Sequence, residues 1–192
     1  MYANRNGSDC KMTMNLPNKL TIFRVILIPF FVLCFYLPVI PFNNVVACVI
    51  FCVASITDFL DGYLARRDGL VTNFGKFMDP LADKLLVGAA LICLIESGQL
   101  PAWAVVIIIS REFIISGFRL IASDNGVVIA ASYWGKFKTV TQMAMVILML
   151  LNFPGAIFPV ITRIVMWAAI ILTVVSLVDY VLKNKDVLKD TK

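Results

Sequence analysis

Long apolar runs alternate with short polar segments along this chain of 192 residues. Several of these runs approach the roughly 20 residues that an α-helix needs to cross a bilayer. Proline, asparagine and glycine occupy the segments between them, where these residues favour turns. The pattern therefore predicts an all-α fold of six transmembrane helices, at about 20–38, 43–65, 80–97, 101–121, 134–152 and 157–182.

The two ends of the chain are polar. Residues 1–13 follow no structural pattern, and we expect them to be disordered or an artificial extension. Asn15–Thr21 contains a proline and a possible asparagine cap, which predicts a short interfacial helix before the first span. We expect a single transmembrane domain over 14–183, followed by a basic cytoplasmic tail over 184–192.

Composition indicates an integral membrane protein and narrows the chemistry. Hydrophobic residues make up 60% of the chain, and the mean hydropathy is +0.90. There is no histidine, which excludes histidine-based catalytic triads and HExxH zinc sites. The cysteines are odd in number and lie mostly in apolar runs, so we expect them to act as small hydrophobic residues.

Positive charge is distributed unevenly between the predicted connections. Lysine and arginine in short connections mark the cytoplasmic side of a membrane protein. The connections after the second and fourth spans are rich in both, as are the termini, whereas the other connections have none apart from Arg163 nearby. We therefore expect a multi-pass protein of the cell membrane, with cytoplasmic termini and an active-site cavity open to the cytoplasmic side.

Carboxylates gather on that same side, between the second and third spans. Asp58 and Asp61 are spaced i, i+3, and Asp79 and Asp83 are spaced i, i+4. On helices, each pair lies on one face with Cβ atoms roughly 5–6 Å apart. Converging carboxylates repel one another unless cations bind between them, and oxygen ligands favour Mg²⁺, Mn²⁺ or Ca²⁺. We predict two divalent cations, Mg²⁺ in the first place and Mn²⁺ as the alternative, suited to phosphoryl transfer.

Small residues and an arginine accompany the carboxylates. Gly62, Ala65 and Gly75 permit the close approach of a ligand or of a neighbouring helix. Arg66 can bind phosphate, pair with an aspartate, or act only as a cytoplasmic anchor. A plainer alternative for the carboxylates is helix capping, because Asp79 is followed by a proline.

The stretch resembles the signature of the CDP-alcohol phosphotransferase family, D-x-x-D-G-x-x-A-R-x8-G-x3-D-x3-D, at every fixed position. The resemblance covers about residues 15–183. It implies transfer of a phosphatidyl or similar group from a CDP-linked donor to an alcohol, with release of CMP. It also implies that Asp83 is the catalytic base, that the metal ligands are Asp58, Asp61, Asp79 and Asp83, and that the donor is bound by Asp58, Asp61, Gly62, Ala65, Arg66, Gly75 and Asp79.

Further cations at the same predicted depth indicate an acceptor that carries its own phosphate. They are Arg24, Arg111, Arg119, Lys136 and Lys138, although cations that extend to the membrane surface give the same pattern. Glu112 is expected to pair with Arg111 or with another of them. The segments Asn15–Arg24, Ser110–Arg119 and Gly135–Gln142 resemble family members that use CDP-diacylglycerol as donor and sn-glycerol 3-phosphate as acceptor.

Two alternatives stay open from the sequence. Within the family, the acceptor could be serine, inositol phosphate or phosphatidylglycerol. Outside it, the carboxylates could serve a divalent-cation transporter, but transport needs them near the bilayer midplane rather than at one side. The expected partners are the two substrates, the lipid bilayer and, by family resemblance, a second copy of the chain; we expect no nucleic acid.

Overall fold

The computed structural model describes residues 16–37, 42–67, 73–124 and 132–184. Within these ranges, the side chains of 16–20, 58–67, 73–80 and 123–124 are outside the description. The described residues form six helices and no strand, which confirms the all-α prediction. The helices are α1 (Leu16–Tyr36), α2 (Asn43–Arg67), α3 (Asn73–Glu96), α4 (Ala102–Asp124), α5 (Tyr133–Leu151) and α6 (Ile157–Lys183).

Two helix starts differ from the sequence prediction. The expected interfacial helix is not a separate element, because α1 continues without a break from Leu16. Its early proline, Pro17, is compatible with a first helical turn, where the backbone N–H has no partner in any case. α3 begins at Asn73, well before its apolar run, because hydropathy marks the membrane boundary and not the helix end. Asp79 therefore lies inside α3, and the capping alternative for this residue is wrong.

The predicted turns between helices are confirmed where they are described. Gly98, after α3, has a φ of 73°, which an L side chain rarely adopts. Asn152, after α5, has a φ of 39° and is the left-handed C-cap whose N–H bonds to Leu148 O. These residues end their helices by backbone geometry, so the connections can be short.

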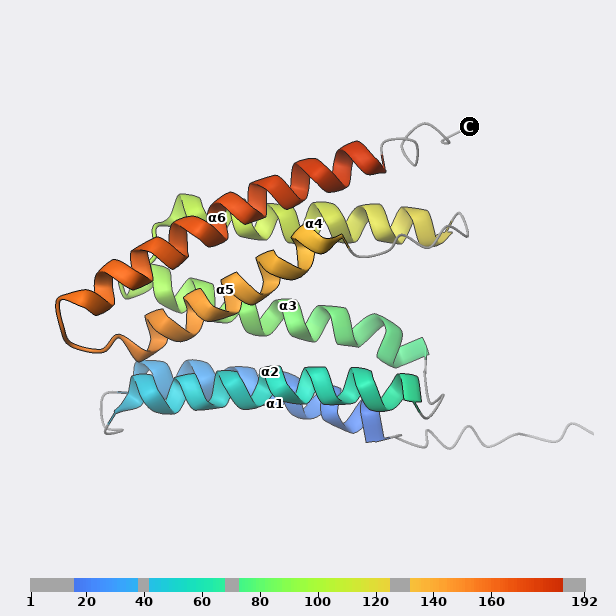
Figure 1. Cartoon of the computed structure of the whole chain (residues 1–192). Coiled ribbons are helices and arrows are strands. Elements are labelled where there is room, and N and C mark those ends of the chain that lie inside the picture. The colour runs from blue at the N-terminus through green and yellow to red at the C-terminus, as the bar shows by residue number, and fades with distance from the viewer. Residues whose placement is uncertain (1–15, 38–41, 68–72, 125–131, 185–192) are drawn as a thin grey trace, which may run out of the picture.

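The helices pack into one bundle around a shared apolar core (Figure 1). α1 packs on α2 and α3, α4 packs on α6 and α3, and α5 packs on α6 and α2. Several alanines are fully buried, which lets backbones approach closely as in membrane-helix packing. Large side chains fill the remaining space, among them Phe31, Phe51, Leu94, Ile108 and Met145.

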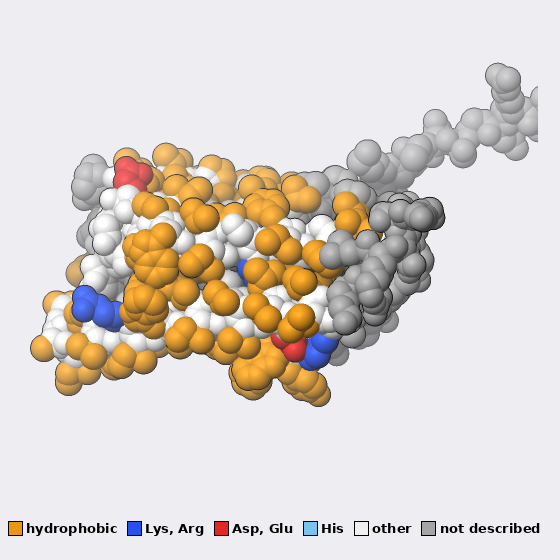
Figure 2. Space-filling model, turned by 90° about the horizontal axis from the view of Figure 1, so that it is seen from above, with side chains coloured by type: hydrophobic (Ala, Val, Ile, Leu, Met, Phe, Trp, Pro, Cys, Tyr) orange, Lys and Arg blue, Asp and Glu red, His pale blue; other side chains and the backbone are white. Residues whose placement is uncertain are grey.

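The outer surface of the bundle is largely apolar. Figure 2 shows hydrophobic side chains spread over the described part of one face, with few charges among them. They belong to many helices and include Phe30, Ile92, Val106 and Ile164, all more than half exposed. Soluble monomers rarely expose apolar patches beyond a few hundred Å². The surface therefore fits a lipid environment.

One helix in the described part of the chain, Ile157–Lys183, is long and apolar enough to cross a membrane on length and composition alone. Thr21–Tyr36 and Asn43–Thr57 are shorter apolar helical stretches. The six expected spans stay a prediction. The arrangement agrees with them in one respect: α2, α4 and α6 end where α3 begins, at the same end of the bundle (Figure 1).

Candidate active site

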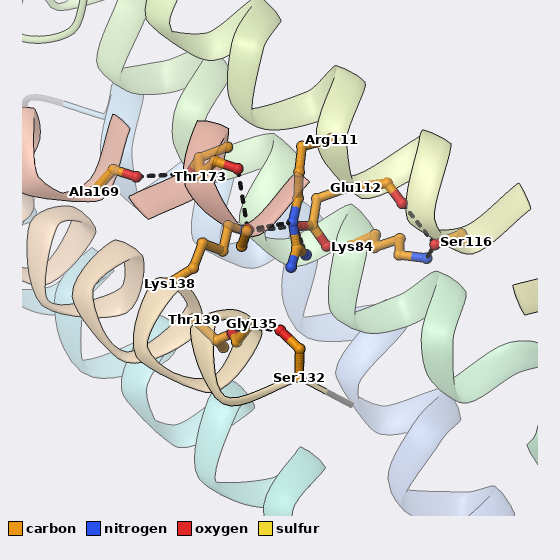
Figure 3. A network of polar contacts seen from close by, with 11 residues as sticks. Lys84, Arg111, Glu112, Ser116, Ser132, Gly135, Lys138, Thr139, Ala169 and Thr173 are labelled. Carbon is orange, nitrogen blue, oxygen red and sulfur yellow. Dashed lines mark hydrogen bonds and ion pairs between the residues drawn. The ribbon is translucent and has the colours of Figure 1, made fainter. Parts of the chain in front are cut away.

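An ion cluster joins three helices inside the bundle (Figure 3). Glu112 on α4 accepts from Arg111 Nη1 at 2.9 Å and from Lys138 Nζ on α5, through the same carboxylate oxygen. Arg111 Nε also donates to Ser176 Oγ on α6 at 3.1 Å. The pairing expected for Glu112 is confirmed, and it includes a second cation from another helix.

Two serines and a glycine position the cluster. The hydroxyl of Ser176 accepts from Arg111 and donates to the Thr173 carbonyl at 3.0 Å. Gly135 lies so close that a Cβ at this position would be 3.3 Å from Arg111 Nη2. The N-cap residue of α5, Ser132, accepts from Gly135 N at 3.2 Å and fixes the start of that helix. Gly135 therefore leaves room for the Arg111 guanidinium beside the start of α5, the helix from which Lys138 reaches Glu112.

Asp83 faces this cluster from α3. It is half-buried and interacts electrostatically with Arg24, Lys84, Glu112 and Lys138. Arg24 on α1 is fully buried. The site thus brings the predicted base together with three of the predicted phosphate-binding cations, Arg24, Arg111 and Lys138.

Lys84, next to Asp83, contacts α4 through Ser116. Its Nζ donates to Ser116 Oγ, and this hydroxyl donates to the Glu112 carbonyl at 2.6 Å. Sequence reasoning missed Ser116 and Ser176 as partners. The available signal was their polarity inside apolar helices: Ser116 lies one turn after Glu112, and Ser176 lies one turn after Thr173.

A cavity of about 440 Å³ lies between α1, α3, α4 and α5. Its polar wall includes Asp83, Lys84, Glu112, Lys138 and Gln142, while Ile28, Leu91, Ile108 and Met143 form part of its apolar wall. Ligand sites commonly have this form, a mostly apolar hollow with a few convergent polar groups. A larger hollow of about 550 Å³ lies on the outer face of α6, around Arg163 and Trp167, and none of the predicted site residues lines it.

Of the five predicted phosphate-binding residues, only Lys138 lines this cavity, and Arg119 and Lys136 lie outside the ion cluster as well. Arg119, in the last turns of α4, is exposed. Lys136, in the first turn of α5, is also exposed and holds its Nζ 5.4 Å from the centre of the Tyr133 ring. Neither belongs to the cavity wall, so a role for them in acceptor binding stays a prediction.

The remaining predicted residues lie on the ends of α2 and α3 where the side chains are outside the description. Asp58, Asp61, Gly62, Ala65 and Arg66 are on the last turns of α2. Gly75 and Asp79 are on the first turns of α3. No group of three metal-ligating side chains occurs among the residues that are described, and of the four aspartates only Asp83 is described in full.

Comparison with known proteins identifies the family of the chain. The model of the family described as CDP-alcohol phosphatidyltransferase matches residues 14–175. A Bacillus subtilis protein named CDP-diacylglycerol–glycerol-3-phosphate 3-phosphatidyltransferase is 46% identical over 189 residues, covering 91% of this chain and 97% of the relative. A Haemophilus influenzae protein of the same name is 44% identical over 184 residues, covering 93% and 98%.

A third relative carries a different name. The probable phosphatidylglycerophosphate synthase of Mycobacterium tuberculosis H37Rv is 44% identical over 169 residues, covering 87% of this chain and 80% of the relative. The family model spans the whole of the Asp58–Asp83 signature and all six helices except the end of α6. The chain belongs to the CDP-alcohol phosphatidyltransferase family.

Proposed function

We propose that the protein transfers the phosphatidyl group of CDP-diacylglycerol to sn-glycerol 3-phosphate, which gives phosphatidylglycerophosphate and CMP. The observation that carries this proposal is the position of Asp83, which shares the wall of one cavity with Glu112 and Lys138, while Arg111 pairs with the same Glu112. An acceptor alcohol that carries a phosphate requires a base for its hydroxyl and cations for its phosphate, and the two lie side by side here. The names of the relatives support the same acceptor.

The charge of the cluster favours a bound anion. Glu112 supplies one negative charge for two positive ones, so the cluster keeps a net positive charge. The Lys138 and Arg111 side chains are only 3% and 10% exposed. Burying a positive charge without an anion is costly, and a phosphate offers strong charge-assisted hydrogen bonds. We assign the acceptor phosphate to Arg111 and Lys138, with Arg24 beside them and with Arg119 and Lys136 at the mouth.

The four aspartates would hold two divalent cations, Mg²⁺ or Mn²⁺. Hard oxygen ligands suit these ions, and the two helices that carry the aspartates contact each other, with α2 ending at the end of the bundle where α3 begins. When bound, the ions would neutralise charge on the pyrophosphate of the donor. Gly62, Ala65, Gly75 and Arg66 would accommodate the CDP group on the same helix ends.

The reaction follows from this placement. The C1 hydroxyl oxygen of glycerol 3-phosphate forms a bond to the phosphorus on the diacylglycerol side of the donor. The phosphoanhydride bond breaks, and CMP leaves with the bonding electrons. Asp83 takes the hydroxyl proton as general base, a role that contributes roughly 10²- to 10⁴-fold in enzymes.

The membrane placement is part of the proposal. All six helices would span the bilayer within a single domain over 14–183, with the cavity and both termini on the cytoplasmic side and the acyl chains of the donor in lipid. The apolar outer surface supports the position in lipid, and the shared end of the bundle, where α2, α4 and α6 end and α3 begins, supports this orientation. The functional unit would be a homodimer, in keeping with the family resemblance.

The decisive experiment measures CMP release by the purified full-length protein with CDP-diacylglycerol and Mg²⁺. Glycerol 3-phosphate is compared with serine, inositol phosphate and phosphatidylglycerol as acceptors. We expect release with glycerol 3-phosphate, and none after addition of EDTA. A higher kcat/KM with another alcohol would overturn the acceptor assignment, and no release with any of them would overturn the reaction.

A further inference from the structure

Gln142 on α5 is a buried polar side chain that the proposed mechanism does not yet use. It lines the cavity beside Lys138 and is only 4% exposed. Its Oε1 atom is buried and has no hydrogen-bond partner. Most buried polar atoms in proteins have a partner, either in the protein or in a bound molecule. This oxygen is therefore a hydrogen-bond acceptor in the cavity wall that a donor group of a ligand would satisfy.

None of the other polar groups of the wall donates to this oxygen, because their hydrogen bonds are directed elsewhere. Lys138 donates to Glu112, and Lys84 donates to Ser116. The hydroxyl of Thr139 donates to the Gly135 carbonyl at 3.0 Å. The neighbouring apolar wall, which includes Ile108 and Met143, offers no donor. A donor for Gln142 Oε1 has to come from what occupies the cavity.

The position of Gln142 relates it to the acceptor. It follows Lys138 by four residues on the same helix, so the two side chains share a face and are separated by about one turn, or 5.4 Å. In glycerol 3-phosphate, the phosphate is assigned to the Lys138 end and the C1 hydroxyl to Asp83. The C2 hydroxyl lies between these groups and has no assigned partner.

Resting on the proposed function, we propose that Gln142 accepts a hydrogen bond from the C2 hydroxyl of glycerol 3-phosphate and determines the specificity for this acceptor. Asp83, Lys138 and Gln142 then contact three different substituents of the glycerol. Three contacts distinguish sn-glycerol 3-phosphate from its mirror image, sn-glycerol 1-phosphate, whereas two do not. A neutral hydrogen bond between site and substrate hydroxyl corresponds to about tenfold or more in discrimination.

The test compares kcat/KM for sn-glycerol 3-phosphate, sn-glycerol 1-phosphate and 3-hydroxypropyl phosphate, which lacks the C2 hydroxyl. In the unmodified protein, we expect glycerol 3-phosphate to be preferred to 3-hydroxypropyl phosphate by about tenfold or more. Gln142→Met keeps the length of the side chain and removes the acceptor. It should lower kcat/KM for sn-glycerol 3-phosphate by that factor and leave kcat/KM for 3-hydroxypropyl phosphate unchanged. The preference for sn-glycerol 3-phosphate over 3-hydroxypropyl phosphate and its preference over sn-glycerol 1-phosphate are then both lost.

Two further variants separate this role from a structural one. Gln142→Glu keeps an acceptor oxygen at the same reach and should retain the preference for the C2 hydroxyl. Gln99→Leu removes an amide in the turn after α3, away from the cavity, and should change none of the ratios. All variants should keep the KM for CDP-diacylglycerol.

The outcomes distinguish the two proposals. Equal kcat/KM for glycerol 3-phosphate and 3-hydroxypropyl phosphate in the unmodified protein overturns the role of Gln142. This result does not depend on whether a variant folds. A preference that persists in Gln142→Met overturns it as well. Absence of turnover with every glycerol phosphate overturns the proposed function, and the inference with it.

Discussion

Removal of the Glu112 carboxylate tests the structural basis of the ion cluster most directly. The change Glu112→Gln keeps the shape of the side chain and removes its charge. It leaves Lys138, whose side chain is 3% exposed, and Arg111, 10% exposed, without their shared anion. Breaking a buried ion pair in this way costs about 3–5 kcal/mol. Because Glu112 itself is 26% exposed, the lower end of that range, about 3 kcal/mol, is expected.

That loss is large enough to measure. For a chain of this size, 1 kcal/mol shifts the melting temperature by roughly 2–4 °C, so the apparent Tm of Glu112→Gln should fall by about 6–12 °C. Thermal unfolding of the purified protein in detergent, followed by tryptophan fluorescence, measures the shift. The donor and acceptor are left out, so that ligand binding does not contribute.

The chain offers a matched control in a second carboxylate. Asp179 pairs with Lys183 across one turn of α6 at 2.7 Å, and the Lys183 side chain is 63% exposed. The Asp179 side chain is 18% exposed, but loss of its carboxylate leaves only a cation that water already solvates. Such pairs contribute about 0–1 kcal/mol, so Asp179→Asn should lower the Tm by less than about 4 °C. Equal shifts for Asp179→Asn and Glu112→Gln, or no shift for the latter, would refute the view that the cluster is a buried, stabilising network.

The other predictions concern turnover. Asp83→Asn should reduce kcat by about 10²-fold or more and leave CDP-diacylglycerol binding largely intact, as measured by CMP release and by donor titration; near-normal turnover would remove the base assignment. Asp58→Ala should abolish the metal-dependent activity, and a rate that survives EDTA would contradict the metal proposal. Arg111→Ala should raise the KM for glycerol 3-phosphate roughly 10- to 100-fold, with a much smaller effect on the donor KM; an unchanged acceptor KM would take Arg111 out of the pocket.

The sequence predicted helices and turns well where side-chain pattern decides them. Apolar runs and the residues Gly98 and Asn152 located the elements, because backbone geometry at these turns depends on the local residue. The start of α3 was missed because its first turns are polar and continue a helix beyond the apolar run. Hydropathy records the environment of a segment, whereas a helix can extend past the boundary of that environment.

The site was predictable in its charges and not in its connections. Glu112 was expected to pair with Arg111, and the pair exists. Its bond to Lys138 depends on how α4 and α5 approach each other, which no spacing within one segment records. The same holds for Ser176, which reaches Arg111 from the last helix. Likewise, the burial of Arg24 and the exposure of Arg119 follow from tertiary packing, although both looked alike in sequence.

The missing side chain of Gly135 has a consequence for where substrate phosphate can be held. A single methyl group there would lie 3.3 Å from Arg111 Nη2, a distance at which the guanidinium would have to give way. The position therefore leaves the Arg111 guanidinium in place against the backbone at the start of α5. Any bulkier residue would move the guanidinium away from α5, and with it the place where a phosphate bound by Arg111 would rest. An alanine here would add one methyl group and is enough to change that place.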